Sequence, residues 1–148
     1  MRLFVLTICL VFSALIIVKS DAGKEVIFTE NAPKPIGPYS QAILANNTLY
    51  ISGQIAINPQ SGSMDNSDIE KETEQVMANL QAVLNKAGLD FSNVVKTTIY
   101  LKEISDFQKV NSIYSKYFKS SPPARETVQV SKLPKEANIE ISMIAVKM

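Results

Sequence analysis

Two side chains of opposite charge near the C-terminus of this 148-residue chain are of the types that could act on a small carboxylate. Arg125 follows Pro-Pro-Ala and begins an alternating, strand-like run, and Glu140 lies between two isoleucines. The planar guanidinium of arginine can form two parallel hydrogen bonds with a carboxylate. A glutamate can position a water molecule or accept its proton. Held on rigid strands, the two side chains would suit the binding and conversion of a small carboxylate.

Other chemistry is restricted by what the composition lacks. The chain has no histidine and no tryptophan, and its one cysteine is Cys9. Serine or cysteine catalysis that depends on histidine, zinc fingers, haem ligation by histidine and a disulfide framework are therefore excluded. Proton transfer is left to Glu, Asp, Lys, Tyr, Ser, Thr or an oriented water. We expect neither a metal nor a cofactor.

The N-terminal segment has the pattern of a secretory signal peptide. Arg2 precedes an apolar run over residues 3–18, and the small residue Ser20 follows it. The run is shorter than the roughly 20 residues needed to span a bilayer. We expect residues 1–20 to be cleaved after Ser20, with Ala22 as a second candidate site, which leaves a secreted or periplasmic domain over 21–148. An uncleaved membrane anchor is the alternative.

The charges of this domain are balanced. The whole chain carries 15 Lys and Arg against 14 Asp and Glu, and two of the basic residues, Arg2 and Lys19, lie in the expected leader. No basic stripe of the kind that nucleic-acid-binding proteins carry is visible. We therefore expect no nucleic-acid partner. We also expect no stable membrane span, because the N-terminal apolar run is too short.

The remaining sequence predicts strands and two helices that would position the reactive side chains. Alternating or β-branched runs predict strands over 25–29, 39–45, 48–55, 94–101, 125–130 and 139–146. One helix is predicted to begin at a Ser67/Glu70 capping box and to end at Gly88. A second helix is predicted to begin at a cap formed by Ser105 and Gln108.

The resulting order is β-β-β-α-β-α-β-β, which indicates an α+β fold. Strand–helix–strand connections are right-handed, so both helices should cover one face of a mixed sheet. The opposite face would carry no helix. A domain of this size would cover such a face by forming an oligomer.

Short motifs along the chain resemble those of the Rid (YjgF) family of reactive-intermediate deaminases, in its RidA-like branch. They are Asn31-Ala-Pro, Ile36-Gly-Pro-Tyr-Ser-Gln41, Ile51-Ser-Gly-Gln54, Val94-Val-Lys-Thr-Thr98, Asp106-Phe107 with Val110-Asn111, Pro123-Ala-Arg125, Leu133-Pro-Lys135 and Ile139-Glu-Ile141. Each motif alone is weak, but eight in the same order are specific. They cover essentially all of the chain after the leader.

The resemblance implies a chorismate-mutase-like subunit that assembles as a homotrimer with clefts between subunits. It also implies hydrolysis of 2-enamino and 2-imino acids, such as 2-aminoacrylate and 2-iminopropionate, to 2-keto acids and ammonia. In such a site Arg125 would hold the substrate carboxylate and Glu140 would place or activate water. Four further positions match residues that line the cleft: Tyr39, Ser52, Gly53 and Asn111.

Thr127 stands where many relatives carry a cysteine, two positions after the arginine. We place it with the substrate-binding residues. Regulation or modification directed at that cysteine cannot apply to this chain.

Other interpretations of these side chains stay open on sequence alone. Arg125 could pair with Glu126 or Glu140 at a subunit interface, and Glu140 could instead be an exposed rim residue. Tyr39 could belong to the core. The amide of Asn111 could serve a loop or a ligand.

Three functions fit the sequence: an imine and enamine deaminase, an exported trimeric binding protein for small molecules without turnover, and an RNA-cleaving translation inhibitor, an activity attributed to some relatives. The lack of histidine and of a basic patch argues against RNA cleavage. Ser52-Gly53 is better explained by space for a close backbone approach than by a nucleophilic serine, because no base accompanies the serine. The presence of both Arg125 and Glu140 favours the deaminase, because a carboxylate binder needs only the arginine.

Overall fold

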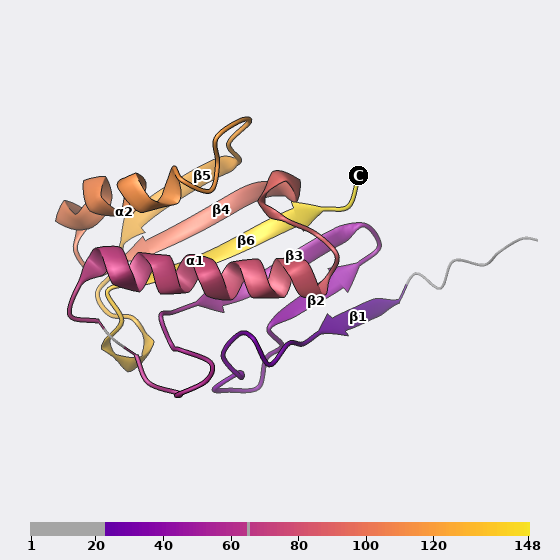
Figure 1. The fold of residues 1–148 in the computed structure, drawn as a ribbon, viewed down its shortest axis with the longest axis horizontal. Helices are drawn as coiled ribbons and strands as arrows, with labels where there is room; N and C mark the ends of the chain where they lie inside the picture. Colours follow the sequence, from indigo (N-terminus) through magenta and orange to yellow (C-terminus); the bar gives the residue numbers. More distant parts are fainter. Residues whose placement is uncertain (1–22, 65) are drawn as a thin grey trace, which may run out of the picture.

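The computed structural model describes residues 23–64 and 66–148. They form one mixed six-stranded sheet with two α-helices, α1 (Ile69–Lys86) and α2 (Phe107–Tyr114), over one face (Figure 1). The strands are β1 (Lys24–Ile27), β2 (Ala42–Ala45), β3 (Thr48–Gln54), β4 (Val94–Leu101), β5 (Ala124–Gln129) and β6 (Ile139–Val146). The expected signal peptide, residues 1–20, lies outside the described part of the chain.

The strands follow the spatial order β1-β2-β3-β6-β4-β5. β4 and β5 are parallel, whereas the other neighbouring pairs are antiparallel. Because β6 is antiparallel to both β3 and β4, those two strands run in the same direction, and α1 connects them. α2 connects β4 to its parallel neighbour β5. The predicted order of elements and the placement of both helices on one face are confirmed.

The alternation of β6 separates the two faces of the sheet. The residues buried beneath the helices are Ile139, Ile141, Met143 and Ala145. One apolar stripe of α1 packs against this layer, and its members are Val76, Met77, Leu80, Val83 and Leu84. Full burial of a side chain of this kind contributes about 1.5–3 kcal/mol to stability. Because side chains alternate along β6 and its odd-numbered residues are buried under the helices, Glu140 points to the open face of the sheet.

The N-terminus of α1 differs by one residue from its predicted cap. The carboxylate of Asp68 accepts hydrogen bonds from the backbone N–H groups of Glu70 (2.8 Å) and Lys71 (3.2 Å). The Ser67 capping box is therefore wrong, because Asp68 is the residue that satisfies the free donors of the first turn. Gly88 follows the last turn with φ of 71°, as its predicted role requires.

α2 begins from a short 3₁₀ turn, Ile104–Asp106, and not from a serine cap. Its N-cap residue, Asp106, makes no side-chain hydrogen bond to the helix. The predicted cap formed by Ser105 and Gln108 is therefore wrong. The 3₁₀ turn itself engages the first backbone donors, since the N–H of Asp106 bonds to the carbonyl of Glu103 (3.1 Å).

Strand prediction was most accurate in the sheet centre. β4 and β6 have the predicted bounds, whereas β2 begins at Ala42 and not at Tyr39. The N–H of Tyr39 bonds to the carbonyl of Gly37 (2.9 Å), so a tight turn replaces the start of the predicted strand.

The face without helices carries apolar side chains. Tyr50 and Val128 are about half exposed there, and they pair across the strands with Ile144 and Tyr100. Over the described residues, no helix combines the length and apolar character that crossing a membrane requires.

Candidate functional site

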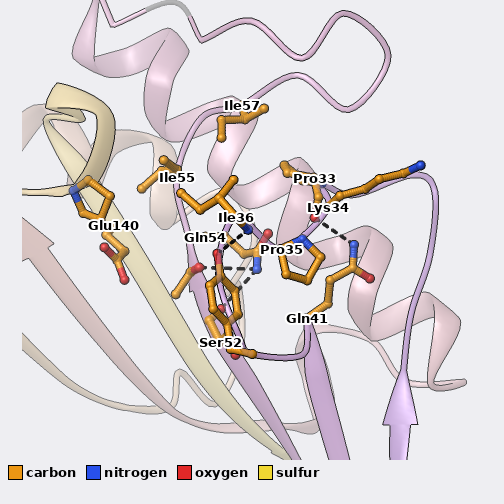
Figure 2. Close-up of a pocket in the computed structure, with 13 residues that line it drawn as sticks. Pro33, Lys34, Pro35, Ile36, Gln41, Ser52, Gln54, Ile55, Ile57 and Glu140 are labelled. Atoms are coloured by element: carbon orange, nitrogen blue, oxygen red, sulfur yellow. Dashed lines mark hydrogen bonds between the residues drawn. The ribbon is translucent and has the colours of Figure 1, made fainter.

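A cavity of about 330 Å³ lies between segment 33–36, the end of β3 and Glu140 of β6. In Figure 2 the Glu140 carboxylate stands on one side of it and the proline-rich segment on the other. Much of its wall is apolar, formed by Pro33, Pro35, Ile36, Ile55, Ile57 and Pro134. Lys34, Gln41, Ser52, Gln54 and Glu140 add polar groups to the lining. A cavity that combines apolar walls with convergent polar groups is typical of a site for a small organic molecule.

Glu140 lies directly over Gly53. The pairing of β3 with β6 shifts register between Ile51 and Gln54, and this bulge brings the Gly53 backbone beneath the carboxylate. A Cβ atom on residue 53 would lie 1.8 Å from Oε1 of Glu140, so the position has no room for a side chain. Burial raises the pKa of the Glu140 carboxyl. A carboxylate of raised pKa is a better proton acceptor than an exposed one.

Ser52 and Tyr39 line the same cavity. The Ser52 hydroxyl donates to the backbone carbonyl of Ser40 (2.7 Å), which occupies its proton. Tyr39 is 47% exposed, and its hydroxyl accepts from the N–H of Ile36 (3.2 Å). Tyr39 therefore supports the cavity wall and does not belong to the core. The resemblance implies that Tyr39, Ser52, Gly53 and Glu140 belong to one cleft, and all four line this cavity.

Gln41 holds the proline-rich wall in place, a role that the sequence did not reveal. Only 1% of this residue is exposed, and its amide nitrogen donates to the carbonyls of Ala32 (3.1 Å) and Pro33 (2.9 Å). Its amide oxygen accepts from the N–H of Thr29 (2.7 Å). A buried amide must find such partners, so an isolated glutamine before an apolar strand was the available signal.

Asn79 of α1 holds the part of the cavity wall formed by Ile55 and Ile57. Its side-chain nitrogen donates to the carbonyls of Ile55 and Ile57, both at 3.0 Å. The Gln75 side chain donates to its oxygen (2.9 Å). The segment after β3 is thereby fixed to the helix layer, although its own residues form no strand.

The Arg125 guanidinium contacts two aromatic rings of α2. Its guanidinium carbon is 4.8 Å from the Tyr114 ring centroid and 5.7 Å from that of Phe107. Within the described residues it has no carboxylate partner, and Glu126 pairs instead with Lys96. The interpretation in which Arg125 pairs with Glu126 or Glu140 therefore finds no support in the single chain. The rings orient the guanidinium while its N–H donors stay free for a ligand.

Arg125 and Glu140 lie on opposite faces of the sheet. Arg125 is aligned with Thr97, and Thr97 with Met143, whose side chains are buried beneath the helices. Glu140 is aligned with Tyr100, which faces the open side. A single copy of this chain therefore does not bring the two charges to one substrate.

Thr127 and Asn111 lie on the helix side with Arg125. Thr127 is aligned with the buried Ile99, and its hydroxyl oxygen is buried without a hydrogen-bond partner among the residues described. Asn111 is half-buried on α2, and no hydrogen bond of its side chain is seen in residues 23–64 and 66–148. The same residues contain no cluster of His, Cys, Asp and Glu that could hold a metal ion.

The family model described as endoribonuclease L-PSP matches residues 29–147. A RutC family protein from Pyrococcus horikoshii is 56% identical over 84% of this chain and 98% of its own length. A human protein named 2-iminobutanoate/2-iminopropanoate deaminase is 49% identical over 86% of this chain and 93% of its own. A solved Rid-family structure of unknown function from Yersinia pestis superposes with a TM-score of 0.83 at 53% identity, covering 84% of this chain and all of that one.

Proposed function

Because the chain belongs to the endoribonuclease L-PSP family, also called the YjgF or Rid family, we propose that it is a hydrolytic deaminase of 2-imino and 2-enamino acids. Relatives at intermediate identity carry the name 2-iminobutanoate/2-iminopropanoate deaminase. The observation that carries the proposal is the half-buried Glu140 carboxylate, held over Gly53 in a cavity whose wall is partly apolar.

The proposed reaction requires only that substrate and water are oriented and that one group accepts a proton. An enamine first takes its imine form, whose C2 is electrophilic. Glu140 accepts a proton from water as the water oxygen bonds to C2, and the proton passes to nitrogen. The product of this addition is a carbinolamine, with a hydroxyl and an amino group on C2. Its hydroxyl proton then passes to the amino nitrogen as the C–N bond breaks and the C2–O bond becomes a carbonyl, which releases ammonia and the 2-keto acid. Proximity and fixed charges are sufficient to accelerate such a step.

In this proposal the substrate carboxylate binds Arg125 of a second copy of the chain. The guanidinium has free donors and packs against the Phe107 and Tyr114 rings, yet it lies on the opposite face from Glu140. Two copies are therefore needed to complete one site, and a homotrimer with three such clefts is the arrangement we propose. Asn111 and Thr127 would then line the cleft beside Arg125.

The test generates the imino acid in the assay with an amino-acid oxidase and measures, with a trapping agent, how much survives. We expect wild type to remove the imine, and Arg125→Ala to lose at least about 100-fold in kcat/KM. Arg125→Lys should recover part of the loss, because it keeps the charge without the planar fork. Lys86→Gln, at the exposed end of α1, is the control. No acceleration by wild type on any common imino acid would leave a binding protein without turnover as the better account.

The family description also raises RNA cleavage as a second activity. Single-stranded RNA in the same assay separates the two proposals. RNA cleavage that survives Arg125→Ala and Glu140→Gln, with no removal of imine, would favour the ribonuclease.

We propose further that residues 1–20 direct export of the domain, on the strength of their apolar run and the following Ser20. N-terminal sequencing of protein recovered outside the producing cells would test this. A start at Met1 would contradict cleavage.

A further inference from the structure

A completely buried carboxylate lies outside the cavity. Glu72, in the first turn of α1, has 0% of its surface exposed. Its Oε1 accepts from the backbone N–H of Asn138 (2.8 Å) and its Oε2 from the side-chain amide of the same residue (2.8 Å). Burial raises the pKa of its carboxyl, and the bonds to Asn138 oppose that shift. A buried carboxylate is costly unless it is hydrogen-bonded in this manner.

Asn138 receives support from three separate parts of the chain. Besides Glu72, its side-chain nitrogen donates to the carbonyl of Asn66 (2.9 Å). Its own carbonyl accepts from the N–H of Lys102, just after β4 (2.9 Å). Asn66 in turn donates to the carbonyl of Glu136 (2.9 Å). These hydrogen bonds fix Asn138, the residue before β6, to α1, to residue 66 and to the end of β4.

The segment that this network holds is strained and forms part of the cavity. Lys135 (φ 54°) and Glu136 (φ 58°) both adopt the left-handed region, which is unfavourable for residues with a side chain. Pro134 lines the cavity, and Glu140 follows Asn138 by two residues. Such a segment keeps its conformation only where its surroundings impose it.

We propose that Glu72 is a positioning residue for Glu140. Through Asn138 it fixes the start of β6, and with it the height of the Glu140 carboxylate over Gly53 and the position of Pro134. Glu72 touches no part of the cavity, so it acts on the substrate only through these residues. The assignment rests on the proposed function, in which Glu140 is the proton acceptor.

The chemistry of the contact explains why a carboxylate is present. Asn138 presents two N–H donors, and an ionised carboxylate offers acceptors to both. A glutamine at position 72 could accept from one Asn138 donor with its oxygen. Its NH2 group would face the other donor, and two donors cannot form a hydrogen bond with each other. Leucine would leave both donors without a partner in a buried place. The position near the helix N-terminus also favours negative charge.

The kinetic test compares Glu72→Gln and Glu72→Leu with Glu74→Gln, an exposed glutamate two residues further along α1. A displacement of a catalytic group by about 1 Å can cost up to about 100-fold in rate. We expect kcat to fall about 10- to 100-fold in Glu72→Leu and less in Glu72→Gln, with KM nearly unchanged. Glu74→Gln should match wild type. A rise in KM with unchanged kcat would overturn the proposal.

A double-mutant cycle separates positioning from a general loss of structure. If Glu72 acts through Glu140, adding Glu72→Gln to Glu140→Gln should cause no further loss of kcat. Equal losses in the two backgrounds would contradict the assignment. If the leucine variant does not fold, the glutamine variant carries the same comparison.

A readout without activity keeps this inference distinct from the deaminase proposal. The carboxyl carbon resonance of Glu140, assigned by its loss in Glu140→Gln, should shift in Glu72→Gln and stay in place in Glu74→Gln. If wild type lacks deaminase activity but this shift occurs, the positioning role stands and the proposed function fails. A Glu140 resonance that does not respond to Glu72→Gln would overturn the positioning role.

Discussion

At the scale of single residues, the site depends on one close approach. Because residue 53 is a glycine, the Glu140 carboxylate can approach the β3 backbone closely, and burial raises the pKa of the Glu140 carboxyl. The effect is steric, because φ at Gly53 is not in the left-handed region. The position of the Glu140 carboxylate therefore depends on the absence of a side chain at residue 53.

Gly53→Ala should destabilise the protein, because the new methyl group would overlap with Glu140 Oε1. Overpacking of this kind costs about 1–3 kcal/mol. In a Glu140→Ala background the space is vacant, so the same substitution should cost much less. Urea unfolding of the four proteins in this cycle measures the difference. Equal costs in both backgrounds would show that Glu140 does not occupy the space above Gly53.

The pH dependence of activity should report the Glu140 carboxyl. Its pKa is raised by burial, so the group binds a proton more tightly than a glutamate in water and becomes a base only above that raised pKa. kcat/KM should therefore rise with pH through a value above that of an ordinary glutamate. Glu140→Gln should lack this limb. Profiles of the same shape in both proteins would remove Glu140 as the proton acceptor.

The same shift predicts the sign of its effect on stability. The folded state holds the proton to a higher pH than the unfolded state, so ionisation opposes folding. Relative to Glu140→Gln, wild-type stability should be highest below the pKa of an unfolded glutamate and should fall as pH rises through the raised value. Thermal unfolding midpoints of the two proteins across this range test the sign, and a wild-type gain with rising pH would contradict it.

At the scale of elements, α2 packs on the sheet and also places two aromatic rings against Arg125 of β5. Phe107 and Tyr114, two helical turns apart on α2, place their rings against the Arg125 guanidinium, and the Tyr114 hydroxyl is itself fixed by Thr97 (3.0 Å). A loose arginine would lose side-chain entropy on binding a carboxylate, whereas this one is already oriented.

Phe107→Leu should weaken carboxylate binding with little change in kcat. A cation–π contact contributes about 0.5–2 kcal/mol, which corresponds to about a 2- to 30-fold rise in KM. Phe107→Tyr keeps the ring and should restore KM. Steady-state kinetics on one imino acid provide both numbers. If leucine and tyrosine behave alike, the ring does not orient Arg125.

Sequence predicted elements well where one pattern dominated. A β-branched run predicted the bounds of β4, and alternation predicted those of β6. The start of α1 was displaced because Ser67 and Asp68 are both good caps, and only the geometry selects Asp68. The faces of Arg125 and Glu140 depend on register across β4, β5 and β6, which a single sequence does not contain. Gln41 and Asn79 were missed because a buried amide has no periodic signature.

At the scale of the whole molecule, the sheet has one covered and one open face. The helices bury the first, while Tyr50 and Val128 leave apolar surface on the second. The sheet separates the two halves of the proposed site. Arg125 lies on the covered side at the edge strand β5, and Glu140 lies on the open side. An assembly in which the edge of one copy meets the open side of the next would join them.

Mixing two inactive variants tests this directly. Arg125→Ala retains Glu140, and Glu140→Gln retains Arg125, so a site between two different copies contains both groups. With random assembly from equal amounts in a closed ring, each of the two positions is intact with a chance of one half, and about one quarter of the sites should be restored. Refolding the variants together and measuring kcat gives the fraction. If both residues served one substrate within a single chain, the mixture would stay as inactive as its components. Recovery near one quarter would therefore place each active site between two copies of the chain.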